Sequence, residues 1–227
     1  MTDSAPQPEL LAALGRTMRG LSALFWGLPL ALVVCFQTAK GEWLRPLNVF
    51  PPLVVTGLLY YGLRLLGRFQ KQERVWIRAL DRAKLFALVN VGLSPFIFWS
   101  GRMPKNTFYE SMVELFMISG LLLLFSLNPV LWRLAAMLPD ETLRDDTRLF
   151  TRINCGLLAF ILCVELVSLA LRQINTLPSF VILFIEVVEH SGQWILLILI
   201  LLPISMTMAL IWKAKEVILS SVFGPEA

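Results

Sequence analysis

The sequence predicts an all-α, polytopic membrane protein with six transmembrane helices that form three helical hairpins. Its 227 residues are 57% hydrophobic and only 16% charged, with a mean hydropathy of +0.71, which is outside the usual range of soluble domains. Long apolar stretches recur along the chain, and the linkers between them alternate between many and few basic residues. Because cytoplasmic loops carry an excess of Lys and Arg, this alternation predicts that both termini are cytoplasmic.

The apolar stretches have the length that a bilayer requires, since a hydrocarbon core of ~30 Å needs ~20 mostly apolar residues per helix. We expect a single transmembrane domain over residues 1–227, with spans at roughly 20–39, 50–67, 85–100, 110–130, 152–171 and 193–212. With the N-terminus inside, fifteen basic residues fall on the inner side and five on the outer side. The sequence therefore predicts a multi-pass protein of the cell inner (plasma) membrane.

The sixth apolar segment is interrupted by polar residues at 186–192. Apolar character runs from Pro178 to Trp212, which would make one helix of ~50 Å at 1.5 Å per residue, longer than the bilayer is thick. We therefore expect 179–191 to form either an outer-leaflet half-helix or the start of a long tilted helix. Prolines inside apolar stretches predict helix kinks at Pro29, Pro95, Pro129 and Pro203.

Two inner linkers, 69–84 and 139–152, are predicted to be amphipathic helices. In the first, Phe69, Trp76, Leu80 and Ala83 form an apolar stripe opposite a basic face, which suits an inner membrane surface with anionic headgroups. The second linker presents both charges, which suits either a protein neighbour or a solvated face. The candidate partner or lipid surface consists of Arg74, Arg78, Arg82, Arg144 and Arg148.

An internal repeat relates residues 81–97 to residues 145–161, at an offset of 64. Eight of the seventeen aligned positions are identical, whereas apolar composition alone would give about two or three. Asn90 aligns with Asn154. A polar side chain within a span more often forms a hydrogen bond to a neighbouring helix than binds a solute. Gly92 aligns with Gly156, and we expect both glycines to permit close helix approach.

Several acidic residues are predicted to lie at membrane depth in the outer half, where carboxylates usually face a bundle interior or water. The possible ion, proton or polar-ligand site consists of Glu114, Glu165, Glu186, Glu189 and His190. Alternatively, the boundary carboxylates are wetted by headgroup water, while Glu165 forms one buried pair or stays protonated. Both interpretations remain open from the sequence.

The sequence argues against several enzyme classes, because it has a single histidine and no H-E-x-x-H, G-x-S-x-G or P-loop signature. Too few histidines are present for His-rich di-iron or bis-His haem sites. We therefore predict no cofactor, metal or catalytic residues, and no nucleic-acid binding, because no basic run is interleaved with exposed aromatic residues.

Three functions are compatible with these features. The favoured one is a non-catalytic integral subunit or scaffold of a larger inner-membrane assembly, with other membrane subunits or further copies of itself as partners. The alternative is an oligomeric proton or cation channel or carrier that uses the acidic outer residues. The second alternative is a lipid-modifying membrane enzyme that uses Glu165, Glu186, Glu189 and His190. The sequence favours a protein without enzymatic activity.

Overall fold

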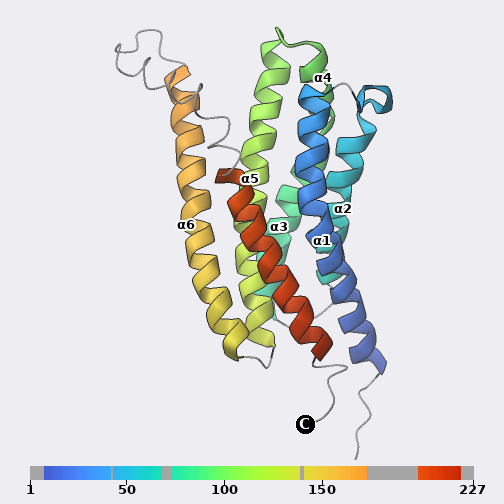
Figure 1. Ribbon diagram of the computed structural model, residues 1–227, viewed down its shortest axis with the longest axis vertical. Coiled ribbons are helices and arrows are strands. Elements are labelled where there is room, and N and C mark those ends of the chain that lie inside the picture. Colours follow the sequence, from blue (N-terminus) through green and yellow to red (C-terminus); the bar gives the residue numbers. More distant parts are fainter. Residues whose placement is uncertain (1–7, 42, 68–72, 139–140, 173–198, 221–227) are drawn as a thin grey trace, which may run out of the picture.

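The computed structural model describes residues 8–41, 43–67, 73–138, 141–172 and 199–220, and within these ranges it has helices and no strands. The elements run side by side along one long axis (Figure 1). In order, they are α1 (Pro8–Lys40), the 3-10 turn η1 (Arg45–Leu47), α2 (Phe50–Leu66), α3 (Arg74–Leu93), α4 (Pro95–Arg102), α5 (Thr107–Met137), α6 (Glu141–Arg172) and a C-terminal helix at 199–220.

Four described helical segments are long and apolar enough to cross a membrane: Ala12–Lys40, Arg74–Arg102, Thr107–Met137 and Glu141–Leu171. The 17-residue helix α2 is also apolar but shorter. The all-helical fold is thus confirmed, and the four apolar segments suggest a membrane-embedded protein. The division into six spans and three hairpins stays a prediction, and the interruption at 179–191 lies outside the described residues.

The predicted kink at Pro95 separates α3 from α4. Proline has no amide hydrogen, so the carbonyl of Val91, four residues earlier, loses its helical donor. The hydroxyl of Ser94 donates to that carbonyl at 2.9 Å, and Ser94 keeps helical backbone angles (φ −56°, ψ −33°). The side chain therefore satisfies the freed carbonyl, and α4 continues from α3 as a second helix.

The first inner linker differs from the separate surface helix that we expected. Trp76, Leu80 and Ala83 are fully buried, as their helical spacing predicts, but they belong to α3, which runs unbroken from Arg74 to Leu93. Residues 141–152 of the second linker likewise open α6, while 69–72 and 139–140 lie outside the described residues. No Pro or Gly separates either linker from the apolar stretch that follows it, so nothing ends the helix there. The linker stripe consequently packs on protein.

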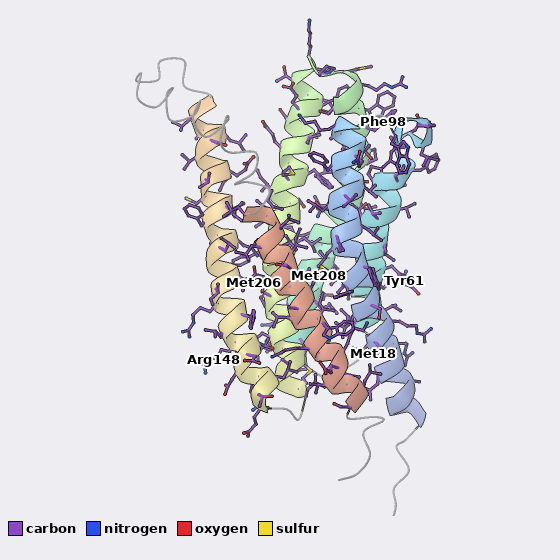
Figure 2. All side chains as sticks on the ribbon, viewed as in Figure 1. Met18, Tyr61, Phe98, Arg148, Met206 and Met208 are labelled. Carbon is purple, nitrogen blue, oxygen red and sulfur yellow. The ribbon has the colours of Figure 1, made fainter. Side chains whose placement is uncertain are left out.

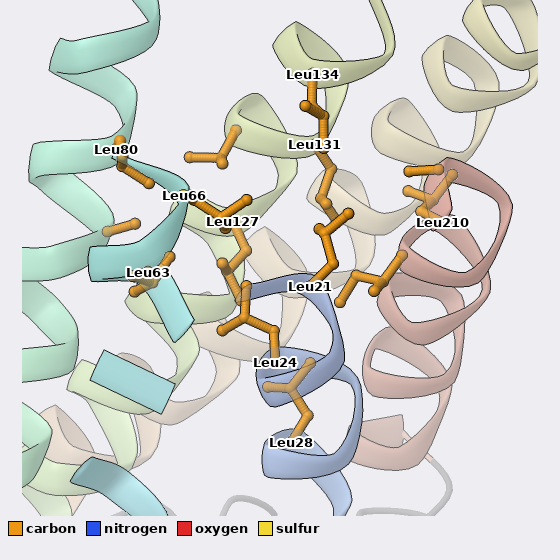
Figure 3. Packing of buried hydrophobic residues seen from close by; sticks show 14 of the residues in the cluster. Leu21, Leu24, Leu28, Leu63, Leu66, Leu80, Leu127, Leu131, Leu134 and Leu210 are labelled. Carbon is orange, nitrogen blue, oxygen red and sulfur yellow. The ribbon is translucent and has the colours of Figure 1, made fainter. Parts of the chain in front are cut away.

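Leucine side chains fill the interior of the bundle (Figure 3). Leu21 and Leu24 of α1 meet Leu63 of α2, Leu127 of α5 and Leu210 of the C-terminal helix in one buried cluster. The outer faces are also apolar, as the exposed Phe36, Val54, Leu85, Phe160 and Val167 illustrate. A bundle that is apolar inside and outside is typical of helices surrounded by lipid.

Close packing between α1 and α2 depends on Gly20 and Gly62. A Cβ atom added at Gly20 would lie 2.9 Å from the carbonyl oxygen of Gly62, and one added at Gly62 would lie 3.0 Å from the carbonyl oxygen of Gly20. Only glycine lets two helix backbones approach so closely. By contrast, the close approach expected at Gly92 and Gly156 does not occur among the described residues, where both are exposed and a Cβ on either would meet nothing within 4 Å.

Replacing Gly62 by alanine should therefore destabilise the bundle by about 1–3 kcal/mol, because the new methyl group forces α1 and α2 apart. Gly57 lies on the same helix, and a Cβ there has open space. Gly57→Ala should be neutral or stabilising by up to about 1 kcal/mol through helix propensity. Reversible unfolding in mixed micelles measures both variants. Equal stabilities for the two variants would contradict the close approach.

Candidate functional site

A buried polar cluster joins three helices around Asn154, which is 0% exposed. The side-chain amide of Asn154 on α6 donates to Oδ1 of Asn128 on α5 at 3.1 Å. Its Nδ2 also lies 3.0 Å from Oγ1 of Thr207 and 3.4 Å from the carbonyl oxygen of Pro203, both on the C-terminal helix. The prediction that Asn154 forms hydrogen bonds between helices matches these contacts.

The partners of Asn154 are themselves held in place by their own helices. Nδ2 of Asn128 donates to the carbonyl of Leu124 at 3.0 Å, and the hydroxyl of Thr207 donates to the carbonyl of Pro203 at 2.7 Å. Asn128 and Thr207 are both 0% exposed. Each interhelical hydrogen bond of this kind contributes about 0.6–2 kcal/mol. The cluster therefore fixes the C-terminal helix against α5 and α6.

Sequence reasoning missed Asn128 and Thr207 as partners of Asn154. Both residues are marked in the sequence by a proline, since Asn128 precedes Pro129 and Thr207 lies four residues after Pro203. The prolines free the carbonyls of Phe125 and Leu199, whereas Asn128 and Thr207 donate to those of Leu124 and Pro203, so a nearby proline marks these polar residues in the sequence without explaining their hydrogen bonds.

Asn90, the repeat equivalent of Asn154, is also buried (4% exposed), on α3. Its Oδ1 has no hydrogen-bond partner among the described residues. One turn earlier, the hydroxyl of Ser119 on α5 donates to the carbonyl of Phe86 on α3 at 3.5 Å. The α3–α5 contact thus has a weaker polar link than the contact of α6 with the C-terminal helix.

The predicted acidic site is only partly within the described residues. Glu114 on α5 and Glu165 on α6 are both half-buried. Glu186, Glu189 and His190 lie outside the described residues, so the grouping of the five side chains stays a prediction. Among the residues that the structure describes, no group of three or more His, Cys, Asp and Glu side chains could hold a metal ion.

The predicted basic surface is exposed on two helices. Arg74, Arg78 and Arg82 project from α3, and Arg144 and Arg148 project from α6. Figure 2 shows Arg148 near one end of the bundle and Phe98 near the other. Near the Arg148 end, Lys213 of the C-terminal helix forms a salt bridge with Asp146 of α6, which adds a second contact between these helices.

An apolar groove of about 450 Å³ lies between α5 and α6. Its lining residues are Leu122, Phe125, Ala159, Leu162, Cys163, Leu166, Val167 and Ala170. A second hollow, of about 250 Å³ and more polar, lies between the ends of α1 and α4 and is lined in part by Thr38, Lys40 and Arg102. The guanidinium of Arg102 lies 5.4 Å from the ring centroid of Phe98. Its charge therefore already contacts an aromatic ring of the same helix, α4.

The fold and these sites define a class: an all-helical protein with four apolar segments able to cross a membrane, a polar three-helix junction and an apolar groove. Comparison with protein-family models, curated proteins and solved structures finds no match to this chain. Its function must therefore be inferred from its own residues.

Thr207→Val should destabilise the protein by about 0.6–2 kcal/mol, because Asn154 loses an acceptor on the C-terminal helix. Ser205→Ala on the same helix is the matched control, since that exposed hydroxyl bonds only to the carbonyl of Leu202 in its own helix. Unfolding in mixed micelles compares the two variants. A Thr207 variant as stable as the Ser205 variant would contradict the role of the cluster.

Proposed function

We propose that the protein is a non-catalytic integral subunit or scaffold of a larger assembly in the cell inner membrane, with both termini cytoplasmic. The observation that carries this proposal is the contrast between a leucine-packed bundle and the sparsely covered helix α6. The leucine cluster occupies the space that a pore through one copy would need. This packing supports a structural role over conduction by a single copy.

Helix α6 supports the proposal because it is the least covered of the four candidate spans. Only 17% of its apolar window is buried, compared with 44% for α5. Phe160, Val164 and Val167 are 58%, 41% and 51% exposed. Small side chains at Ala159 and Ala170 line the neighbouring groove, and small residues permit a further helix to pack closely. We therefore place the partner interface on α6.

The inner end of α6 suits a protein partner. Exposed Arg144 and Arg148 lie beside Glu141 and Asp145, so the surface offers charges of both signs. The exposed arginines of α3, at 74, 78 and 82, form a more uniformly basic face that suits anionic lipid headgroups. Charge pairing at the α6 surface would set the orientation and choice of the partner more than its affinity.

Burial along α3 and α6 supports the proposal that they are copies of one repeated unit. At the offset of 64, four buried positions coincide, namely Ala83 with Thr147, Asn90 with Asn154, Ser94 with Leu158, and Ile97 with Ile161, whereas buried Leu80 aligns with exposed Arg144. The aligned Gly92 and Gly156 both face outward. Two helices with the same inward face would occupy equivalent places in successive hairpins, as same-orientation repeats do.

Arg144→Glu should release partner subunits, because it reverses a charge at the proposed α6 interface. Purification in mild detergent followed by mass spectrometry should recover stoichiometric partners with the wild type and at least tenfold less with this variant. Arg78→Glu on α3 is the matched control and should retain the partners. Recovery of a homogeneous monomer from the wild type would contradict the proposal.

An oligomeric proton or cation channel or carrier is the alternative that one observation favours. Glu165 is half-buried on α6, between apolar runs, and makes no salt bridge with another described residue. An ionisable group in a membrane helix is a candidate for proton or ion transfer. For the lipid-modifying enzyme, three of the four proposed residues lie outside the described ranges, and no described contact favours it.

Under this alternative, Glu165→Gln should abolish cation or proton flux into liposomes that contain the purified protein, because the neutral amide cannot carry the charge. Glu110→Gln, which changes an exposed carboxylate at the start of α5, is the control and should leave the flux unchanged. Absence of flux from well-folded wild-type protein would contradict the carrier and leave the scaffold as the proposal.

A further inference from the structure

Two buried oxygen atoms on α6 have no hydrogen-bond partner among the described residues: Oγ1 of Thr151 and Oδ1 of Asn154. Residues three apart on a helix lie on the same face, so these atoms belong to one patch of α6. Asn154 is 0% exposed, and its amide nitrogen is already occupied by the bonds to Asn128 and Thr207. A buried acceptor without a donor is destabilising, so Oδ1 of Asn154 needs a donor in the folded protein.

Thr151 differs from the other helical threonines whose bonds are described. Thr17, Thr38, Thr56 and Thr207 each donate to the carbonyl four residues earlier in their own helix, at 3.1, 2.7, 2.7 and 2.7 Å. This bond is the usual way for a hydroxyl in an apolar helix to satisfy itself. The hydroxyl of Thr151 does not use it, so it is free to bond to a ligand.

The chemistry of the patch points to a small uncharged donor. Oδ1 of Asn154 can only accept a hydrogen bond, whereas Oγ1 of Thr151 can both donate and accept. Both side chains are neutral, and the charges of Asp146 and Lys213 on these helices already neutralise each other. A buried water molecule requires two to four polar partners, and these two atoms supply the first two.

We propose that one water molecule is bound inside the bundle, where it donates to Oδ1 of Asn154 and bonds to Oγ1 of Thr151. It completes the polar cluster between α5, α6 and the C-terminal helix. The internal repeat supplies a comparison: Asn90 has the same unpartnered Oδ1, but Ala87 stands where α6 has Thr151. Helix α3 thus has only the amide acceptor of this site, whereas α6 has both the amide acceptor and the hydroxyl.

Thr151→Val tests the proposal, because it keeps the shape of the side chain and removes the hydroxyl that binds the water. We expect the unfolding equilibrium constant in mixed micelles to rise about tenfold. Thr17→Val is the matched control: that fully buried hydroxyl bonds only to the carbonyl of Ala13, so its loss should change the constant less than threefold. Equal, small effects of the two substitutions would overturn the proposal.

A double-mutant cycle with Asn154→Leu gives the second measurement. Once Asn154 is replaced, the water has lost its acceptor, so adding Thr151→Val should change the unfolding constant little. Asn154→Ser takes the place of the leucine variant if that variant does not fold. Additive effects would overturn the proposal, as would a high-resolution map that shows Oγ1 of Thr151 bonded directly to Oδ1 of Asn154 without water density between them.

Discussion

The arrangement of the C-terminal helix depends on hydrogen bonds between a few polar side chains inside a bundle whose interior is packed mainly by leucine. Leucine contacts alone specify rotation and register poorly, because lipid tails are as apolar as leucine and can replace those contacts. Lipid tails cannot replace the hydrogen bonds of amide and hydroxyl groups. Asn154 can satisfy its amide only where Asn128 and Thr207 lie opposite it, so this cluster selects one placement of the C-terminal helix.

The first pair of helices is joined by a different interaction. Gly20 and Gly62 bring the backbones of α1 and α2 together, so this contact relies on close packing and carries no buried amide cluster among its described bonds. On α1, the next aromatic side chain after Gly20 is Phe25. Its ring lies 5.8 Å from that of Trp212, which links α1 to the C-terminal helix by aromatic contact. The contacts of α1 and those of α6 with the C-terminal helix therefore rely on different chemistry.

Local patterns in the sequence predicted which faces are buried, and they failed to predict what covers those faces. The stripe of Trp76, Leu80 and Ala83 was identified from its helical spacing, and its burial is confirmed. The same pattern did not distinguish a membrane surface from a protein core. Asn154 was identified as a polar packing residue, but its partner Thr207 is 53 residues away, and no local spacing encodes such a pair. Gly92 and Gly156 show the same limit, because a glycine permits close approach without requiring a neighbour.

The distribution of polar groups along α6 also bears on the choice between scaffold and carrier. Glu165 and Asn154 lie on one face of the helix, with Leu158 (1% exposed) and Ile161 (6% exposed) between them. Eleven residues correspond to about 16 Å at 1.5 Å per residue. A proton or cation that reached Glu165 would therefore meet a long apolar segment before the next polar group on this face. Conduction through one copy would require α6 to move away from its neighbours, whereas a scaffold needs only the packed state that the structure describes.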